Sequence, residues 1–83
     1  MVQFNNINDI ENFLRELANA AKNKEDKEMI SFFFNVGYPT LTEYLGELRI
    51  VLKKALEFGK FQEYRSEINE LISVINSSLR LSN

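Results

Sequence analysis

Carboxylate side chains at helical spacing are the first feature of this chain that could do chemistry. Glu63, Glu67 and Glu70 stand at i, i+4 and i+7, and Glu43 and Glu47 repeat the four-residue step. On one face of a helix such a row can bind Mg²⁺ or Ca²⁺, which prefer oxygen ligands. The same spacing is typical of a solvated helix surface that is partly paired with neighbouring cations. We favour the solvated surface and predict no metal site.

Residues for other kinds of catalysis are scarce. The chain holds no His and no Cys, so it lacks the most common acid–base residue, the thiol nucleophile and the soft metal ligands. Its three glycines are far apart in the sequence and form no phosphate-binding loop. We predict that the protein is not an enzyme, with no catalytic residue and no cofactor.

Composition and charge bound the class of protein. The 83 residues are 45% hydrophobic and 27% charged, which predicts one folded domain over residues 1–83. The absence of cysteine excludes a disulfide-stapled scaffold. The net charge is −2 and no segment is basic, so we expect no nucleic-acid partner. A DNA-binding helix-turn-helix over residues 29–48 is also disfavoured. Its second helix opens with acidic and apolar residues, and DNA would repel the acidic ones.

The sequence carries no membrane signal. MVQFNN at the N-terminus lacks the features of a signal peptide. No apolar run approaches the roughly 18 residues that a spanning helix needs. We expect a cytoplasmic protein with no membrane insertion.

Apolar residues recur at steps of three and four along most of the chain, which predicts helices. Short links between them make successive helices antiparallel. The predicted fold is therefore all-α, an antiparallel up-down four-helix bundle with a short second helix. The predicted helices cover about residues 8–22, 25–36, 41–58 and 60–80.

Residues with capping roles mark the ends of these helices. Asn6 or Asn8 can cap the first helix. The third opens with a capping box in which Thr40 caps the backbone and Glu43 can reach back. Gly59 suits the left-handed residue that ends a helix.

Two further glycines have structural explanations. Gly37 is also placed as a left-handed helix end, and Pro39 then prevents continuation. Gly46 lies inside the third helix, where glycine costs about 1 kcal/mol relative to alanine. We expect it to permit a close helix crossing.

Three consecutive phenylalanines, Phe32, Phe33 and Phe34, stand in the short second helix. Successive residues of a helix point about 100° apart, so the three rings span more than one packing face. We expect Phe33 to be buried beside Met29 and Ile30, and Phe32 or Phe34 to lie outside the core. A strand over residues 30–36 is the rival interpretation, because Ile, Phe and Val favour strands.

The fourth helix carries an apolar stripe at heptad spacing. A bundle helix explains it better than a coiled coil, so we expect a monomer or a weak homodimer that uses this stripe. Nearby, Phe58 and Phe61 flank Gly59 and either close the core or form an apolar knob. The stripe residues are Phe61, Tyr64, Ile68, Leu71, Ile75 and Ser78.

Three stretches resemble the immunity proteins of pediocin-like bacteriocins, the enterocin A immunity type. "YPTLTEYLGEL" is similar to the Pro-led start of that family's third helix, and "KKALEFGKF" to the end of that helix and its glycine turn. "SEINELISVINSSLR" is similar to the family's last helix. The likeness covers residues 25–80 loosely.

The resemblance implies a cytosolic, non-catalytic four-helix protein that protects a producer cell from its own bacteriocin. It also implies a protein partner. That partner is the bacteriocin's receptor, the mannose phosphotransferase permease, which the family contacts on its inner side. Family specificity lies in the C-terminal half. Carried onto this chain, that implies a partner-binding set formed by Phe58, Phe61, Tyr64, Arg65 and Arg80. The chain departs from the family in its very short C-terminal tail and its mildly acidic charge.

Exposed aromatics also permit a second hypothesis. The chain could be a small helical adaptor or inhibitor that binds another protein through them.

Overall fold

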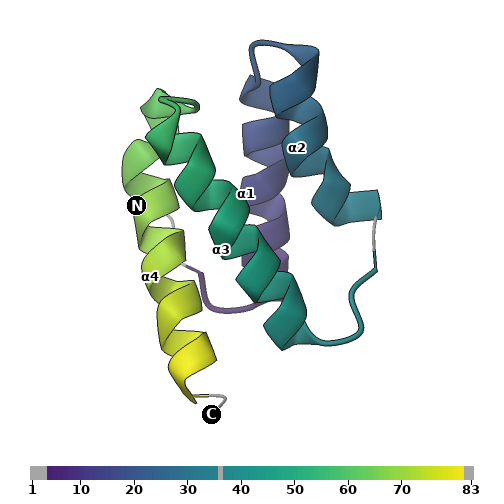
Figure 1. The fold of residues 1–83 in the computed structure, drawn as a ribbon, viewed down its shortest axis with the longest axis vertical. Coiled ribbons are helices and arrows are strands. Elements are labelled where there is room, and N and C mark those ends of the chain that lie inside the picture. Colours follow the sequence, from purple (N-terminus) through teal and green to yellow (C-terminus); the bar gives the residue numbers. More distant parts are fainter. Residues whose placement is uncertain (1–3, 36, 82–83) are drawn as a thin grey trace. The chain divides into compact units, whose positions relative to one another are not determined.

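The computed structural model describes residues 4–35 and 37–81, and for residues 34, 35, 80 and 81 it describes the backbone alone. The described residues form helices and no strand (Figure 1). This confirms the all-α class and the presence of four helices, and the rival strand is wrong for residues 30–35, which belong to a helix. The elements are α1 (Ile7–Ala20), α2 (Lys24–Asn35), α3 (Leu41–Glu57), the short 3-10 helix η1 (Gln62–Tyr64) and α4 (Arg65–Leu81).

The chain divides into two compact units, residues 1–37 and 38–83. In the first unit α1 packs against α2, and in the second α3 packs against α4. Each unit is thus a pair of antiparallel helices joined by a short link (Figure 1). The second helix has 12 residues against 17 for α3 and α4, so it is short, as predicted.

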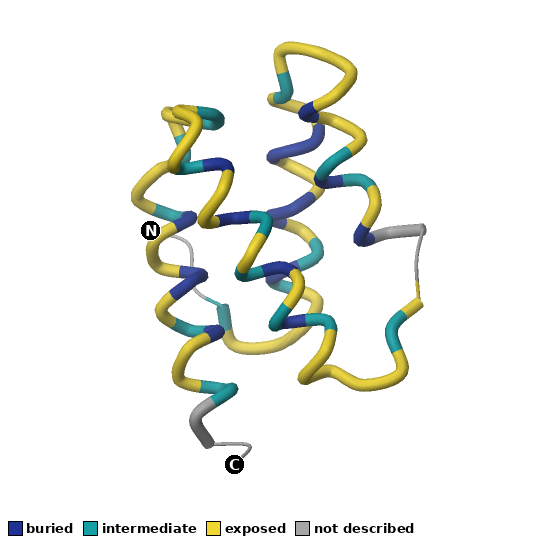
Figure 2. The backbone as a smooth tube through the Cα atoms, in the orientation of Figure 1, coloured by how far each residue is buried: buried dark blue, intermediate teal, exposed yellow. Residues whose placement is uncertain are grey.

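Helix α1 buries one face because its apolar residues return every three or four positions. Leu14 and Leu17 are fully buried, as is Ile30 on α2. Phe4 extends this apolar contact, since its ring meets Phe13 edge to face at 5.4 Å. Figure 2 shows the resulting alternation of buried and exposed backbone along α1. The buried residues of α1 are Ile10, Phe13, Leu14, Leu17 and Ala18.

The start of α1 is held by side-chain caps. Asn6, rather than Asn8, is the N-cap, and its Oδ1 accepts a hydrogen bond from the Asp9 amide at 3.0 Å. Asp9 in turn accepts from the Asn5 amide at 2.9 Å. Both bonds satisfy amides that would otherwise lack a partner within the helix.

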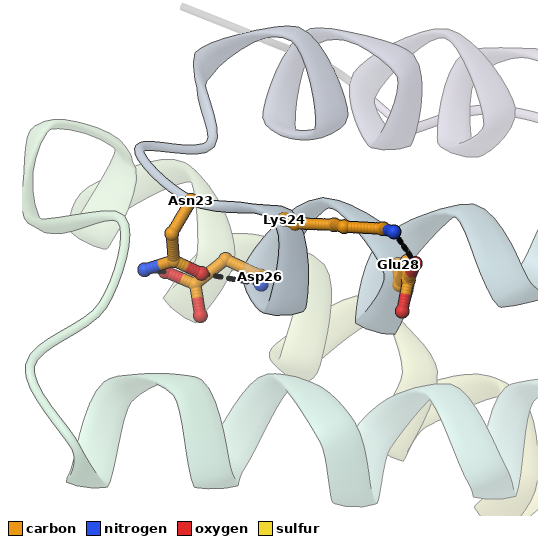
Figure 3. Close-up of polar contacts among 4 residues, drawn as sticks. All are labelled: Asn23, Lys24, Asp26 and Glu28. Carbon is orange, nitrogen blue, oxygen red and sulfur yellow. Dashed lines mark hydrogen bonds and ion pairs between the residues drawn. The ribbon is translucent and has the colours of Figure 1, made fainter.

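A polar cluster also marks the start of α2 (Figure 3). Asn23 Oδ1 accepts from the Asp26 amide at 2.9 Å, and Asn23 Nδ2 donates to the Asp26 carboxylate at 3.2 Å. Asp26 is buried, with only 8% of its surface exposed. Lys24 and Glu28 also pair in Figure 3, but at 3.9 Å and on exposed side chains, so this ion pair contributes little stability.

Helices α3 and α4 meet through apolar faces. Leu48 and Leu52 on α3 are fully buried, and so are Ile68, Leu71 and Ile75 on α4. The centre of the predicted α4 stripe is therefore covered within the chain, whereas Phe61, Tyr64 and Ser78 are half-buried. A weak homodimer that uses this stripe stays a prediction.

One polar bridge also joins this pair of helices. Arg49 Nη1 on α3 donates to Asn76 Oδ1 on α4 at 2.8 Å, on the exposed side of the contact. At the start of α3, Thr40 Oγ1 accepts from the Glu43 amide at 3.1 Å, which confirms Thr40 as the N-cap.

Two glycine predictions have different outcomes here. A Cβ added at Gly46 would meet nothing within 4 Å, so the expected close crossing at this position is wrong. At Gly37 the predicted left-handed conformation depends on Val36, which lies outside the described residues. None of the helices described here is both long and apolar enough to span a membrane.

We predict that Asn23→Ala lowers the free energy of unfolding by about 1–2 kcal/mol, because it removes the N-cap of α2 and both hydrogen bonds between Asn23 and the buried Asp26. Urea unfolding followed by circular dichroism measures the loss. Asn12→Ala is the matched control on the exposed face of α1, where the better helix former raises stability by a few tenths of a kcal/mol. Equal changes in both variants would contradict the capping role.

Candidate interaction surface

The turn between α3 and α4 holds four of the five predicted partner-binding residues. Phe58 follows the last residue of α3, Phe61 precedes η1, Tyr64 ends η1 and Arg65 begins α4. The backbone of this turn therefore decides how the four side chains are presented.

Helix α3 ends in a Schellman motif. Gly59 adopts φ 70°, its amide donates to Leu56 O at 3.1 Å, and the Lys60 amide donates to Ala55 O at 2.8 Å. These bonds satisfy carbonyls of the last helical turn. The left-handed conformation of Gly59 is thus the one predicted, since glycine has no Cβ to oppose it.

The fourth helix begins later than predicted. Residues 58–61 form turns, η1 follows, and α4 starts at Arg65 rather than near residue 60. The physical reason is the conformation of Phe61, which is left-handed at φ 53° and ψ 40°. An α-helix of L-residues cannot pass through such a position. The Tyr64 amide instead closes a 3-10 turn on Phe61 O at 2.9 Å.

Phe61 carries backbone strain. A non-glycine residue in the left-handed region costs about 1–2 kcal/mol, and among bulky residues it is uncommon. Sequence reasoning gave no signal for it, because it assigned the positive φ of this link to Gly59 alone.

The four side chains differ in exposure. Phe58 is 70% exposed, the largest value among the exposed large apolar residues of the described chain. Phe61 and Tyr64 are half-buried, and Arg65 is exposed. Of the two interpretations of the aromatic pair, the apolar knob therefore fits Phe58, while Phe61 is partly covered.

Arg80 does not belong to this turn. It lies near the C-terminal end of α4, fifteen residues after Arg65, which is roughly 22 Å along a helix. Its side chain lies outside those described. Its role as a partner-binding residue at the end of the fourth helix stays a prediction.

Charges of both signs lie close to Phe58 in the sequence. Lys54, Glu57 and Glu63 are exposed close to it in the sequence, and Lys60 is half-buried. The arrangement offers an apolar anchor with a polar rim, which is the usual organisation of a protein contact surface.

The predicted carboxylate row does not lie on a single α-helix. Glu63 belongs to η1, whereas Glu67 and Glu70 belong to α4. Their spacing predicted one shared helix face. The three residues do not share one, because η1 and α4 are different kinds of helix. Among the residues that the structure describes, no group of three or more carboxylates is arranged to hold a metal ion.

The phenylalanine triplet of α2 divides largely as expected. Phe33 is 6% exposed and Ile30 is fully buried, whereas Phe32 is 49% exposed. The two rings meet edge to face at 5.8 Å. Phe32 therefore does not belong to the core. The structure does not describe the side chain of Phe34.

No family model, curated protein or solved structure matches this chain.

We predict opposite effects of Gly→Ala at two positions of this unit. Gly59→Ala destabilises by about 1–2 kcal/mol, because it puts a Cβ on a left-handed residue, and that Cβ would lie 3.1 Å from Gln62 Nε2. Gly46→Ala stabilises by up to about 1 kcal/mol, because its Cβ enters open space on a helix.

Thermal unfolding of the two variants beside the parent protein measures both effects. A loss of stability in Gly46→Ala, or no loss in Gly59→Ala, would contradict the assigned roles.

Proposed function

We propose that this chain is a non-enzymatic bacteriocin immunity protein. In this proposal its four helices form an antiparallel up-down bundle in the cytoplasm of the producer cell. The protein acts on the cytosolic side of the bacteriocin-bound receptor, a membrane sugar permease, through the α3–α4 turn.

The observation that carries the proposal is the exposure of Phe58 on a conformationally fixed turn. Phe58 exposes 70% of its surface, so its ring is free to enter a pocket of a partner. Aromatic anchors that enter a pocket supply much of the binding energy of protein interfaces. Because the Schellman motif and the left-handed Phe61 hold the backbone, little conformational entropy is lost on binding.

The resemblance of residues 38–61 to the Pro-led helix and glycine turn of the immunity family supports the same assignment. The turn that presents Phe58 lies within the half of the chain to which that family's specificity maps. The absence of His and Cys from the sequence supports a role in binding rather than catalysis.

The alternative is a small helical adaptor or inhibitor that binds another protein through exposed aromatics. Phe32 is the observation in its favour, since it exposes 49% of its surface on α2, which belongs to the other unit. An adaptor that engages its partner through α2 would use this ring instead of Phe58.

We predict that expression of the chain in a sensitive strain raises resistance to at least one pediocin-like peptide. Phe58→Ser abolishes this protection, because it removes the apolar anchor without touching the core. Phe32→Ser is the matched control, with the same substitution on an exposed ring of the other unit, and it retains protection. Growth inhibition across a peptide panel measures the outcome, and thermal unfolding verifies that both variants fold.

Unchanged killing by every peptide of the panel would refute the immunity function. Loss of protection through Phe32→Ser, with Phe58→Ser still active, would move the contact to α2. Affinity capture of the tagged chain separates the two hypotheses, since a permease subunit supports immunity and a soluble partner supports the adaptor.

A further inference from the structure

We draw no further inference here: the strongest candidate, the strained left-handed backbone of Phe61 between α3 and η1, belongs to the α3–α4 turn that is already described as the candidate interaction surface.

Discussion

The reversal of the chain after α3 depends on two backbone conformations that L-amino acids rarely adopt. Gly59 and Phe61 both have positive φ, at 70° and 53°. The first allows the amides of residues 59 and 60 to bond the last carbonyls of α3, and the second keeps residue 61 out of α4, which starts at residue 65 after η1. The buried stripes of α3 and α4 can face each other only because this link turns the chain back. The exposure of Phe58 follows from the same geometry, since it sits where the helix has ended and its partner has not begun.

Apolar contact supplies the cohesion within each unit, and the polar contacts define where the helices begin and end. Fully buried leucines and isoleucines occupy the facing stripes, and each contributes about 1.5–3 kcal/mol when removed from water. The side chains of Asn6, Asn23 and Thr40 each accept a hydrogen bond from the backbone amide three residues later. Such caps are individually worth about 1 kcal/mol. The stripes determine which faces meet, and the caps determine the residue at which each helix starts.

The sequence predicted the helices well where periodicity and capping chemistry agree. Thr40 and Gly59 were both identifiable, because a capping hydroxyl and a residue without Cβ each have one strong structural use. The start of α4 was not identifiable, because the side chain of Phe61 gives no sign that its backbone is left-handed. Asn23 was missed because it follows a lysine in a stretch that resembles a helix end. The candidate surface was predicted in part: the turn residues come together, while the exposure of Phe58 depends on backbone geometry that spacing does not encode.

The pairing of neighbouring helices has a consequence for how the protein is made. Within each unit, the two packed helices are consecutive in the chain and joined by a short link. Closing such links costs little chain entropy, and proteins dominated by local contacts fold in microseconds to milliseconds. Synthesis proceeds at only about 5–20 residues per second. Each helical pair can therefore form from one contiguous stretch of chain, on a timescale much shorter than that of synthesis.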